Sequence, residues 1–328
     1  MKKFQAPTPK LQRSAKFQAP KNRRARIDVW RLKFLWSLVV GAWCFSAPAQ
    51  LVDGQPKNET QISARKENVP ANTNLPSLFL IGDSTVRNGR GEGGGGQWGW
   101  GDQLAVFFDT SKINVVNRAL GGTTTRTYYR DFWPRTLALM QRGDVVIMQF
   151  GTNGGAVNDA ARARGELRGI GGETQDITNL VTKKFETVHT FGWYEMQMVT
   201  EARARGVAPV ICSLIPRNTW RDGKVPRPGT DSQAGWAAAA ATAANVPFID
   251  LHEIIAQQYD ALGQEAVKEL FVANAGPHTS LAGAQTNAIC VVSGLKALAE
   301  NPVAKFFSDN AATVKPASGG GEKLESKK

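Results

Sequence analysis

The feature that most constrains the fold is the apolar run Leu78–Ile81 and the three residues after it, Gly82, Asp83 and Ser84. A short apolar run closed by turn residues is typical of a strand buried on both faces, as in a parallel sheet. Reactive groups in open parallel sheets lie just past the carboxyl ends of the strands. We therefore expect Ser84 where a nucleophile would be useful, although Gly-Asp-Ser is also common as a plain turn.

The formal net charge of +12 on 328 residues is concentrated near the amino terminus. Residues 1–33 hold eleven Lys or Arg and one acid, and residues 34–49 hold none of either. From Gln50 onward, 29 basic residues stand against 27 acidic ones. A body so close to neutral offers no basic face to a polyanion, so we expect no nucleic-acid partner.

Residues 34–45 form an apolar run that follows the basic segment and precedes Ser46-Ala-Pro-Ala49. A basic region, an apolar core and small residues at the exit are typical of a secretory signal peptide. The run is shorter than the roughly 20 residues of a spanning helix. We predict a signal peptide over 1–49, a secreted (periplasmic or extracellular) protein, and no stable membrane insertion after cleavage. The long basic region leaves an uncleaved anchor or a later translation start as alternatives.

Composition divides the remainder of the chain into three parts. Residues 50–74 are polar without apolar periodicity and are predicted to be a linker. Residues 75–308 are predicted to form the folded domain, and a chain of this length is sufficient for one large α/β domain. Residues 309–328, which end in a Gly, Lys, Glu and Ser tract, are predicted to be a disordered tail.

Strand-like and helix-like segments alternate through the predicted domain. This alternation predicts an α/β fold, with a parallel sheet of about five strands, helices on both faces and right-handed crossovers. Asp102 is expected to cap a helix that runs through Phe108. Residues 155–190 form a long insert, which we expect to be a functional loop or disordered. The further strand-like segments are Ile113–Asn117, Asp144–Phe150, Ala208–Ile215 and Pro247–Leu251, and the helix-like segments are Trp133–Gln141, Phe191–Arg205 and Gly235–Ala244.

Groups suited to acyl transfer follow three of these strands. Ser84 is the candidate nucleophile. Gly122 lies in a Gly-Gly turn, where its N–H can approach a bound oxygen without a Cβ in the way. Asn153 adds a side-chain amide. The N–H of Ser84, the N–H of Gly122 and the Asn153 amide would form an oxyanion hole, in which one donor is typically worth roughly 3–4 kcal/mol.

A serine hydroxyl also needs a base, and the chain has three histidines. His278 lies in a Gly/Pro loop just before a helix-like segment, which suits a base held on a rigid turn, and we prefer it. His252 follows the last strand and fits a core or helix-start position equally well. His189 stands beside aromatic residues and fits packing or substrate contact.

In order along the chain, these groups resemble the four blocks of the SGNH (GDSL) hydrolases over about residues 75–300. Finer details are similar to the rhamnogalacturonan acetylesterase branch, family twelve of the carbohydrate esterases. The blocks are Gly82-Asp83-Ser84, the turn at Gly122, Gly151-Thr152-Asn153 and His278, and the finer details are Asn117–Gly122, Val188–Tyr194, Ile215–Asn218 and His278–Ala284.

The resemblance implies a three-layer, flavodoxin-like sheet with Ser84 and His278 as catalytic residues. It implies a carbohydrate O-acetylesterase that works through an acetyl-serine intermediate. Its substrate would be an acetylated plant cell-wall polysaccharide, most simply rhamnogalacturonan or another pectin. An esterase, lipase or thioesterase acting on another acyl group, and a catalytically weakened carbohydrate-binding homologue, are the alternatives.

Two positions depart from the family pattern. An aspartate usually stands three residues before the catalytic histidine, and here that position is Ala275. Gly154 replaces the Asp that commonly follows Asn153. Loss of an orienting carboxylate can cost about 10⁴ in turnover. A backbone carbonyl or Asn274 would then orient His278, or an acid from elsewhere would, or the enzyme would be slow or inactive.

Partners and cofactors follow from the remaining charged and sulfur-bearing residues. Arg87, Arg126 and Arg217 follow strand ends, where they are candidate partners for uronate carboxylates or are solvated surface charges. No Cys/His spacing reads as a metal site, and we expect neither metal nor cofactor. Cys212 and Cys290 form at most one disulfide. We expect a monomer.

Overall fold

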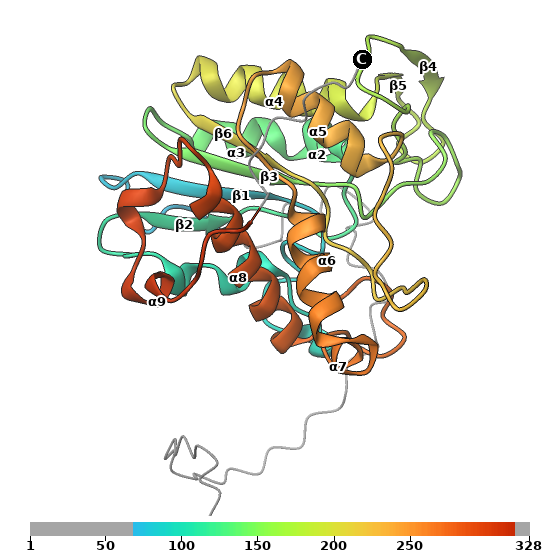
Figure 1. The fold of residues 1–328 in the computed structure, drawn as a ribbon. Coiled ribbons are helices and arrows are strands. Elements are labelled where there is room, and N and C mark those ends of the chain that lie inside the picture. Colours follow the sequence, from blue (N-terminus) through green and yellow to red (C-terminus); the bar gives the residue numbers. More distant parts are fainter. Residues whose placement is uncertain (1–67, 319–328) are drawn as a thin grey trace, which may run out of the picture. The chain divides into compact units, whose positions relative to one another are not determined.

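Residues 68–318 are described in the computed structural model of this chain. The predicted signal peptide and most of the predicted linker lie outside the described residues. At the centre is a five-stranded sheet in the order β2-β1-β3-β6-β7, with every neighbouring pair parallel (Figure 1). The predicted α/β fold is therefore confirmed. The strands are β1 (Ser77–Gly82), β2 (Asn114–Asn117), β3 (Val145–Gln149), β6 (Ala208–Cys212) and β7 (Phe248–Ile249).

Helices cover both faces of the sheet (Figure 1). On one face lie α2 (Thr125–Asp131), α3 (Trp133–Leu139), α4 (Phe191–Ala204) and α5 (Gln233–Ala243). On the other lie α6 (Leu251–Leu262) and α8 (Leu281–Ala297), with the short helices α7 (Gln264–Lys268) and α9 (Asp309–Ala312).

The apolar run in β1 supplies both halves of the core. Phe79 and Ile81 pack toward α2–α5, whereas Leu78 and Leu80 pack toward α6 and α8. Successive side chains of a strand point to opposite faces, so one continuous apolar run can fill both. All four side chains are fully buried, and each contributes about 1.5–3 kcal/mol relative to exposure.

The chain leaves β1 toward β2 on one side and then crosses to β3 on the other. The register pairs Leu80 with Asn117 of β2, and Gly82 with Gln149 of β3. Beyond β2, the N–H of Leu120 donates to the Gly82 carbonyl at 2.9 Å. The turns after β1, β2 and β3 therefore lie at one edge of the sheet, at the switch point where open α/β sheets bind ligands.

Residues 100–108 differ from the predicted single helix. They form two 3₁₀ turns, η2 (Trp100–Gln103) and η3 (Ala105–Phe107). Asp102 lies inside the first turn, and its Oδ1 accepts a hydrogen bond from Asn117 Nδ2 at 2.8 Å. Its predicted role as a helix cap was wrong because the carboxylate is engaged by the end of β2. Burial raises the pKa of Asp102 to about 6.

The folded part extends beyond the predicted boundaries at both ends. Asn72, assigned to the linker, accepts a hydrogen bond through its carbonyl from Asn114 Nδ2 at 2.9 Å. The predicted disordered tail begins with α9, and Ala311 within it is fully buried. Ala317 N–H donates to the Ser293 carbonyl at 3.0 Å, so residues 309–318 pack along α8. The polar composition of the linker and the low-complexity composition of the tail gave no sign of these contacts.

The insert over residues 155–190 contains an antiparallel hairpin, β4 (Gln175–Thr178) and β5 (Phe185–Val188). Arg126 of α2, whose side chain is 0% exposed, donates from Nε and Nη2 to the two carboxylate oxygens of Glu186, each at 2.7 Å. Burial opposes ionisation of Glu186, but hydrogen bonds from Arg126 and Asn179 lower its pKa to about 2. The Arg126 Nη1 also donates to the Val157 carbonyl at 2.7 Å. Arg126 therefore anchors the insert, which corrects its predicted role in substrate binding.

Replacing Arg126 by Met should lower the free energy of unfolding by about 3 kcal/mol or more, because removing one member of a buried ion pair leaves the other poorly compensated. The matched control is Arg130→Met, which removes a partly exposed partner of the same carboxylate and should cost no more than about 1 kcal/mol. Urea unfolding measures both. Equal, small losses would contradict the anchoring role.

Candidate active site

Ser84 stands immediately after β1, at the edge where the three turns meet. Gly82 has φ +156°, and a Cβ there would overlap the Gln149 carbonyl oxygen, so only glycine lets β1 end this close to β3. On the other side, a Cβ placed on Gly121 would lie 3.3 Å from the Ser84 Cβ. The turn after β2 is thus packed directly against the serine.

His278 lies beside Ser84 although 194 residues separate them in sequence. Its Nε2 is 2.9 Å from the Ser84 Oγ. The loop that carries His278 is fastened on its far side, where Trp98 N–H donates to the Thr279 carbonyl at 2.9 Å and Thr279 Oγ1 donates back to the Trp98 carbonyl at 2.8 Å. The structure therefore brings together the predicted nucleophile and the preferred base at hydrogen-bonding distance.

The main chain of Ala275 acts on the His278 imidazole and raises its pKa, and the Ala275 carbonyl also accepts the His278 backbone N–H at 3.4 Å. Since Nε2 faces Ser84, a bond from Nδ1–H to this carbonyl is the arrangement that leaves Nε2 to accept the serine proton. Asn274 adopts φ +59° in the same loop, and its side chain makes no hydrogen bond to His278 within residues 68–318. The predicted orienting role of Asn274 is therefore corrected, and the Ala275 carbonyl is the group beside the ring.

Burial is the main reason why the pKa of His278 lies below 6.5, since it penalises the imidazolium. The Ala275 hydrogen bond and the charge of Asp83 act in the opposite direction, and the charge of Arg217 lowers the pKa further. The imidazole is consequently neutral at pH 7, which is the form that a general base requires.

Two backbone donors beside Ser84 are unoccupied. Within the described part of the chain, neither the Ser84 N–H nor the Gly122 N–H donates to another protein group. Gly122 has φ +80°, a conformation that favours glycine. Asn153 Nδ2 donates to the Thr123 carbonyl at 3.0 Å, which holds its amide against the same turn. Unpaired donors in a fixed turn can stabilise an oxyanion.

Asp83 is a site residue for which no role was predicted from the sequence. It is 0% exposed, and its Oδ1 accepts from the Thr85 N–H at 2.9 Å and Oγ1 at 2.7 Å. Its Oδ2 accepts from the Thr152 N–H at 3.3 Å. Burial raises the pKa of Asp83, and these hydrogen bonds lower it. The carboxylate ties the serine turn to the turn after β3.

The remaining two candidate arginines have different environments. Arg87 is only 8% exposed, its Nη2 donates to the Arg90 carbonyl at 2.9 Å, and burial lowers its pKa. It is packed into the fold, which corrects its predicted role in substrate binding. Arg217 is exposed, its Nη2 donates to the Thr152 carbonyl at 3.1 Å, and its charge acts on His278. Arg217 therefore remains a candidate for contact with substrate.

The other two histidines lie in other settings. His189 stacks on Trp193 with ring centroids 3.6 Å apart, and His252 belongs to α6. Cys212 and Cys290 are both buried free thiols. Within residues 68–318, no cluster of three or more His, Cys, Asp or Glu side chains could hold a metal ion, and no helix has the length and apolarity to cross a membrane.

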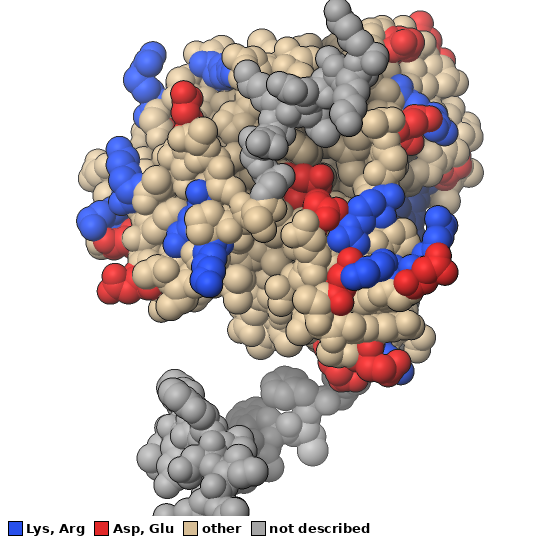
Figure 2. Space-filling view, in the orientation of Figure 1, with Lys and Arg blue, Asp and Glu red and all other residues tan. Residues whose placement is uncertain are grey.

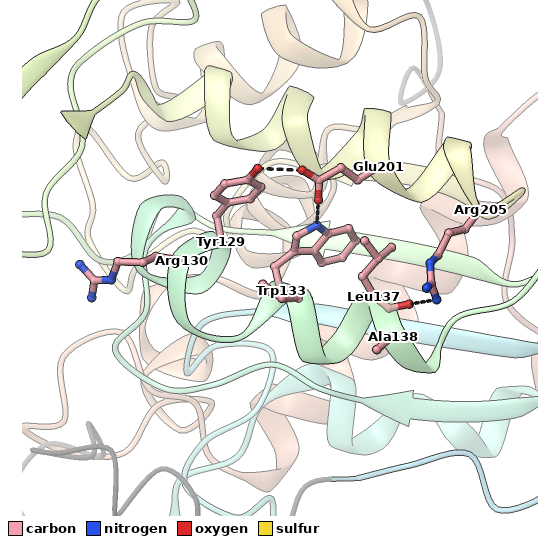
Figure 3. A pocket seen from close by; sticks show the side chains of 8 residues that line it. Tyr129, Arg130, Trp133, Leu137, Ala138, Glu201 and Arg205 are labelled. Carbon is pink, nitrogen blue, oxygen red and sulfur yellow. Dashed lines mark hydrogen bonds between the residues drawn. The ribbon is translucent and has the colours of Figure 1, made fainter. Parts of the chain in front are cut away.

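Two hollows lie away from Ser84. One, of about 370 Å³, is formed by α2, α3 and α4, and in it Glu201 accepts hydrogen bonds from Tyr129 Oη and Trp133 Nε1, both at 2.7 Å (Figure 3). Its carboxylate is therefore already satisfied by the protein. The other, of about 990 Å³, includes Val207 and Ala208 at the start of β6, the strand end opposite to the site. Neither hollow includes a candidate catalytic residue.

The sequence of this chain is similar to a known protein family and to two named proteins. Residues 80–285 match the GDSL-like lipase/acylhydrolase family. A rhamnogalacturonan acetylesterase of Emericella nidulans is 31% identical over 209 residues, which cover 63% of this chain and 79% of that protein. A probable rhamnogalacturonan acetylesterase of Bacillus subtilis, YesY, is 26% identical over 226 residues, covering 67% and 93%.

A solved structure shares the fold at lower identity. The Bacillus subtilis protein YXIM superimposes with a TM-score of 0.54 at 21% identity, over 68% of this chain. This chain spans 56% of the length of that structure.

The electrostatics of His278 predict the pH dependence of Ser84 reactivity. Labelling by a serine-directed fluorophosphonate should rise with pH through the His278 pKa and level off above it, because only the neutral imidazole accepts the proton. Replacing Arg217 by Gln removes a charge that disfavours the imidazolium, so the His278 pKa should rise and the acid limb should move to higher pH. Labelling rates between pH 4 and 9 test this, and an acid limb that moved downward would contradict the assignment.

Proposed function

The chain belongs to the GDSL-like lipase/acylhydrolase family, and we propose that it is a carbohydrate O-acetylesterase that acts on an acetylated plant cell-wall polysaccharide, most simply rhamnogalacturonan. The observation that carries this proposal is the 2.9 Å contact between Ser84 Oγ and His278 Nε2 beside the unoccupied N–H groups of Ser84 and Gly122. The names of the two curated relatives support the acetyl group and the glycan.

In the proposed mechanism, His278 takes the Ser84 proton as the hydroxyl attacks the acetyl carbonyl. The N–H groups of Ser84 and Gly122 and the Asn153 amide stabilise the tetrahedral oxyanion. His278 then protonates the departing sugar oxygen, which leaves an acetyl-serine. A water molecule, deprotonated by His278, attacks that ester, and His278 returns the proton to Ser84 Oγ as acetate leaves. Every proton is carried by the imidazole, so the sequence of steps needs no cofactor.

Arg217 supports a uronate-bearing substrate. It is exposed beside the site, and a guanidinium can pair with a carboxylate through two parallel hydrogen bonds. We further propose that the protein is exported, acts as a monomer and binds neither nucleic acid nor, after cleavage, a membrane. On the face shown in Figure 2, Lys and Arg lie interspersed with Asp and Glu, which does not favour a polyanion partner.

Ala275 favours one alternative, a catalytically weakened homologue that binds glycans. A carbonyl dipole orients the imidazole but supplies less compensation for the imidazolium than a carboxylate would. Measuring acetate release from acetylated rhamnogalacturonan, acetylated xylan and nitrophenyl esters of short and long acids separates the candidates. Glycan binding without release of acetate from any of them would favour the weakened homologue, and preference for long acyl chains a lipase.

Replacing Ser84 by Ala should lower acetate release by at least about 10³-fold while leaving the thermal unfolding midpoint unchanged, because the step that forms the covalent intermediate is lost. Ser111→Ala, an exposed serine far from the site, is the matched control and should keep full activity. Acetate is measured by a coupled assay on acetylated rhamnogalacturonan. Activity retained by the Ser84 variant would reject the nucleophile.

Replacing Ala275 by Asp should raise kcat about tenfold or more, because a carboxylate at this position can stabilise the imidazolium that forms in the transition state. The same charge should raise the His278 pKa, so the acid limb of kcat/KM should move to higher pH. Ala275→Asn, which is similar in size but uncharged, is the control and should show no rise in that pKa. An Asp variant with unchanged kcat and pH profile would show that the Ala275 carbonyl already stabilises the imidazolium sufficiently.

A further inference from the structure

Arg164 of the insert reaches both turns that carry the proposed oxyanion donors. Its Nη1 donates to the Gly122 carbonyl at 2.7 Å, and its Nε donates to the Gly154 carbonyl at 3.1 Å. Gly122 carries one of the proposed oxyanion donors, and Gly154 directly follows Asn153. One guanidinium therefore bridges the end of β2 and the end of β3.

Arg164 bonds the backbone at two of its most flexible residues. Neither Gly122 nor Gly154 has a side chain, so each has more conformational freedom than any other residue type. Fixing the carbonyl of Gly122 limits rotation about φ and ψ of this residue, and so limits how far its N–H can turn. Fixing the carbonyl of Gly154 limits movement of the main chain at Asn153 in the same way. The hydrogen bond from Asn153 Nδ2 to the Thr123 carbonyl forms a second link between the same two turns.

Arg164 is itself held firmly. Its own carbonyl accepts from Thr124 Oγ1 at 2.7 Å, and the next residue, Gly165, donates its N–H to the Ala156 carbonyl at 3.1 Å. A Cβ on Gly165 would overlap the Gly155 carbonyl oxygen, so this segment of the insert packs closely against the segment that begins it. Burial lowers the pKa of Arg164, and the charges of Glu166 and Asp83 act against this.

We propose that Arg164 is a positioning residue for the oxyanion hole, holding the Gly122 and Asn153 turns in the geometry in which their donors converge on one oxygen. The proposal rests on the proposed esterase function. It gives the insert a part in the chemistry, and it requires a guanidinium, because two carbonyls in different turns must be reached by donors in a fixed planar arrangement.

The test compares Arg164→Gln and Arg164→Lys with the wild type on p-nitrophenyl acetate, a small ester that needs no glycan contacts. The matched control is Arg168→Gln, an exposed arginine of the same insert that pairs with Asp231. We expect kcat to fall about 10- to 100-fold in both Arg164 variants with KM within about twofold, because misplacement of donors by about 1 Å affects the transition state and not binding. Arg168→Gln should match the wild type.

Thermal unfolding and Ser84 labelling by a fluorophosphonate separate positioning from simple structural support. A positioning role predicts that both Arg164 variants melt within a few degrees of the wild type yet label at least tenfold more slowly. Full activity in either variant would overturn the proposal, and so would a loss of kcat that follows the loss of folded protein. A wild-type chain that hydrolysed no ester would overturn the proposed function and this inference together, whereas an active wild type with an equally active Arg164→Gln would overturn the inference alone.

Discussion

The parallel pairing of β1 with β2 on one side and β3 on the other is the constraint on which the rest of the site depends. Hydrogen bonds in a parallel pair fix the register. β1 and β3 end opposite each other at Gly82 and Gln149, and beyond the end of β2 Leu120 still bonds Gly82, so the three turns face the same volume. Close approach is then decided by single residues. Gly82 allows β1 to end against Gln149, and Gly121 lets the next turn rest on Ser84. A Cβ at Gly82 would overlap the Gln149 carbonyl oxygen, and one at Gly121 would press on Ser84, so the position of the hydroxyl depends on the spacing of the backbone.

Orientation and charge compensation are separate requirements for a catalytic imidazole, and this chain meets them with different groups. The Ala275 main chain lies against the ring, while the negative charge that raises its pKa belongs to Asp83, a residue adjacent in sequence to the nucleophile. Asp83 is fully buried and engaged by Thr85 and Thr152, so its charge is fixed in position but does not touch the imidazole. The Ala275 main chain thus favours the tautomer that a general base needs. The Asp83 charge stabilises the imidazolium only from a distance.

Much of the fold was predictable because its signals are local. Apolar runs, their spacing and the Gly-rich turns determined the strands, the order of the layers and the positions of Ser84, Gly122, Asn153 and His278. The errors concern side chains whose partners are remote in sequence. Asp102 is a residue type typical of a helix cap but is bound by Asn117, and residues 309–318 belong to the predicted disordered tail but pack along α8. Arg87 and Arg126 follow strand ends as predicted, but whether an arginine there faces solvent depends on carbonyls and carboxylates that only the folded chain brings near.

The insert is held in place by residues that are remote from it in sequence. Burying a guanidinium is costly unless all its donors are satisfied, so a chain retains one only where the geometry is tightly determined. Arg126 meets this condition through Glu186 of β5 and the carbonyl of Val157, and it thereby fixes the insert on α2. With the insert fixed, Arg164 is presented to the turns after β2 and β3. Arg126 holds the insert on α2, and the insert in turn holds Arg164 against the two turns. The insert interrupts the β/α alternation in the sequence, but in the folded protein it is hydrogen-bonded to the turns that carry Gly122 and Asn153.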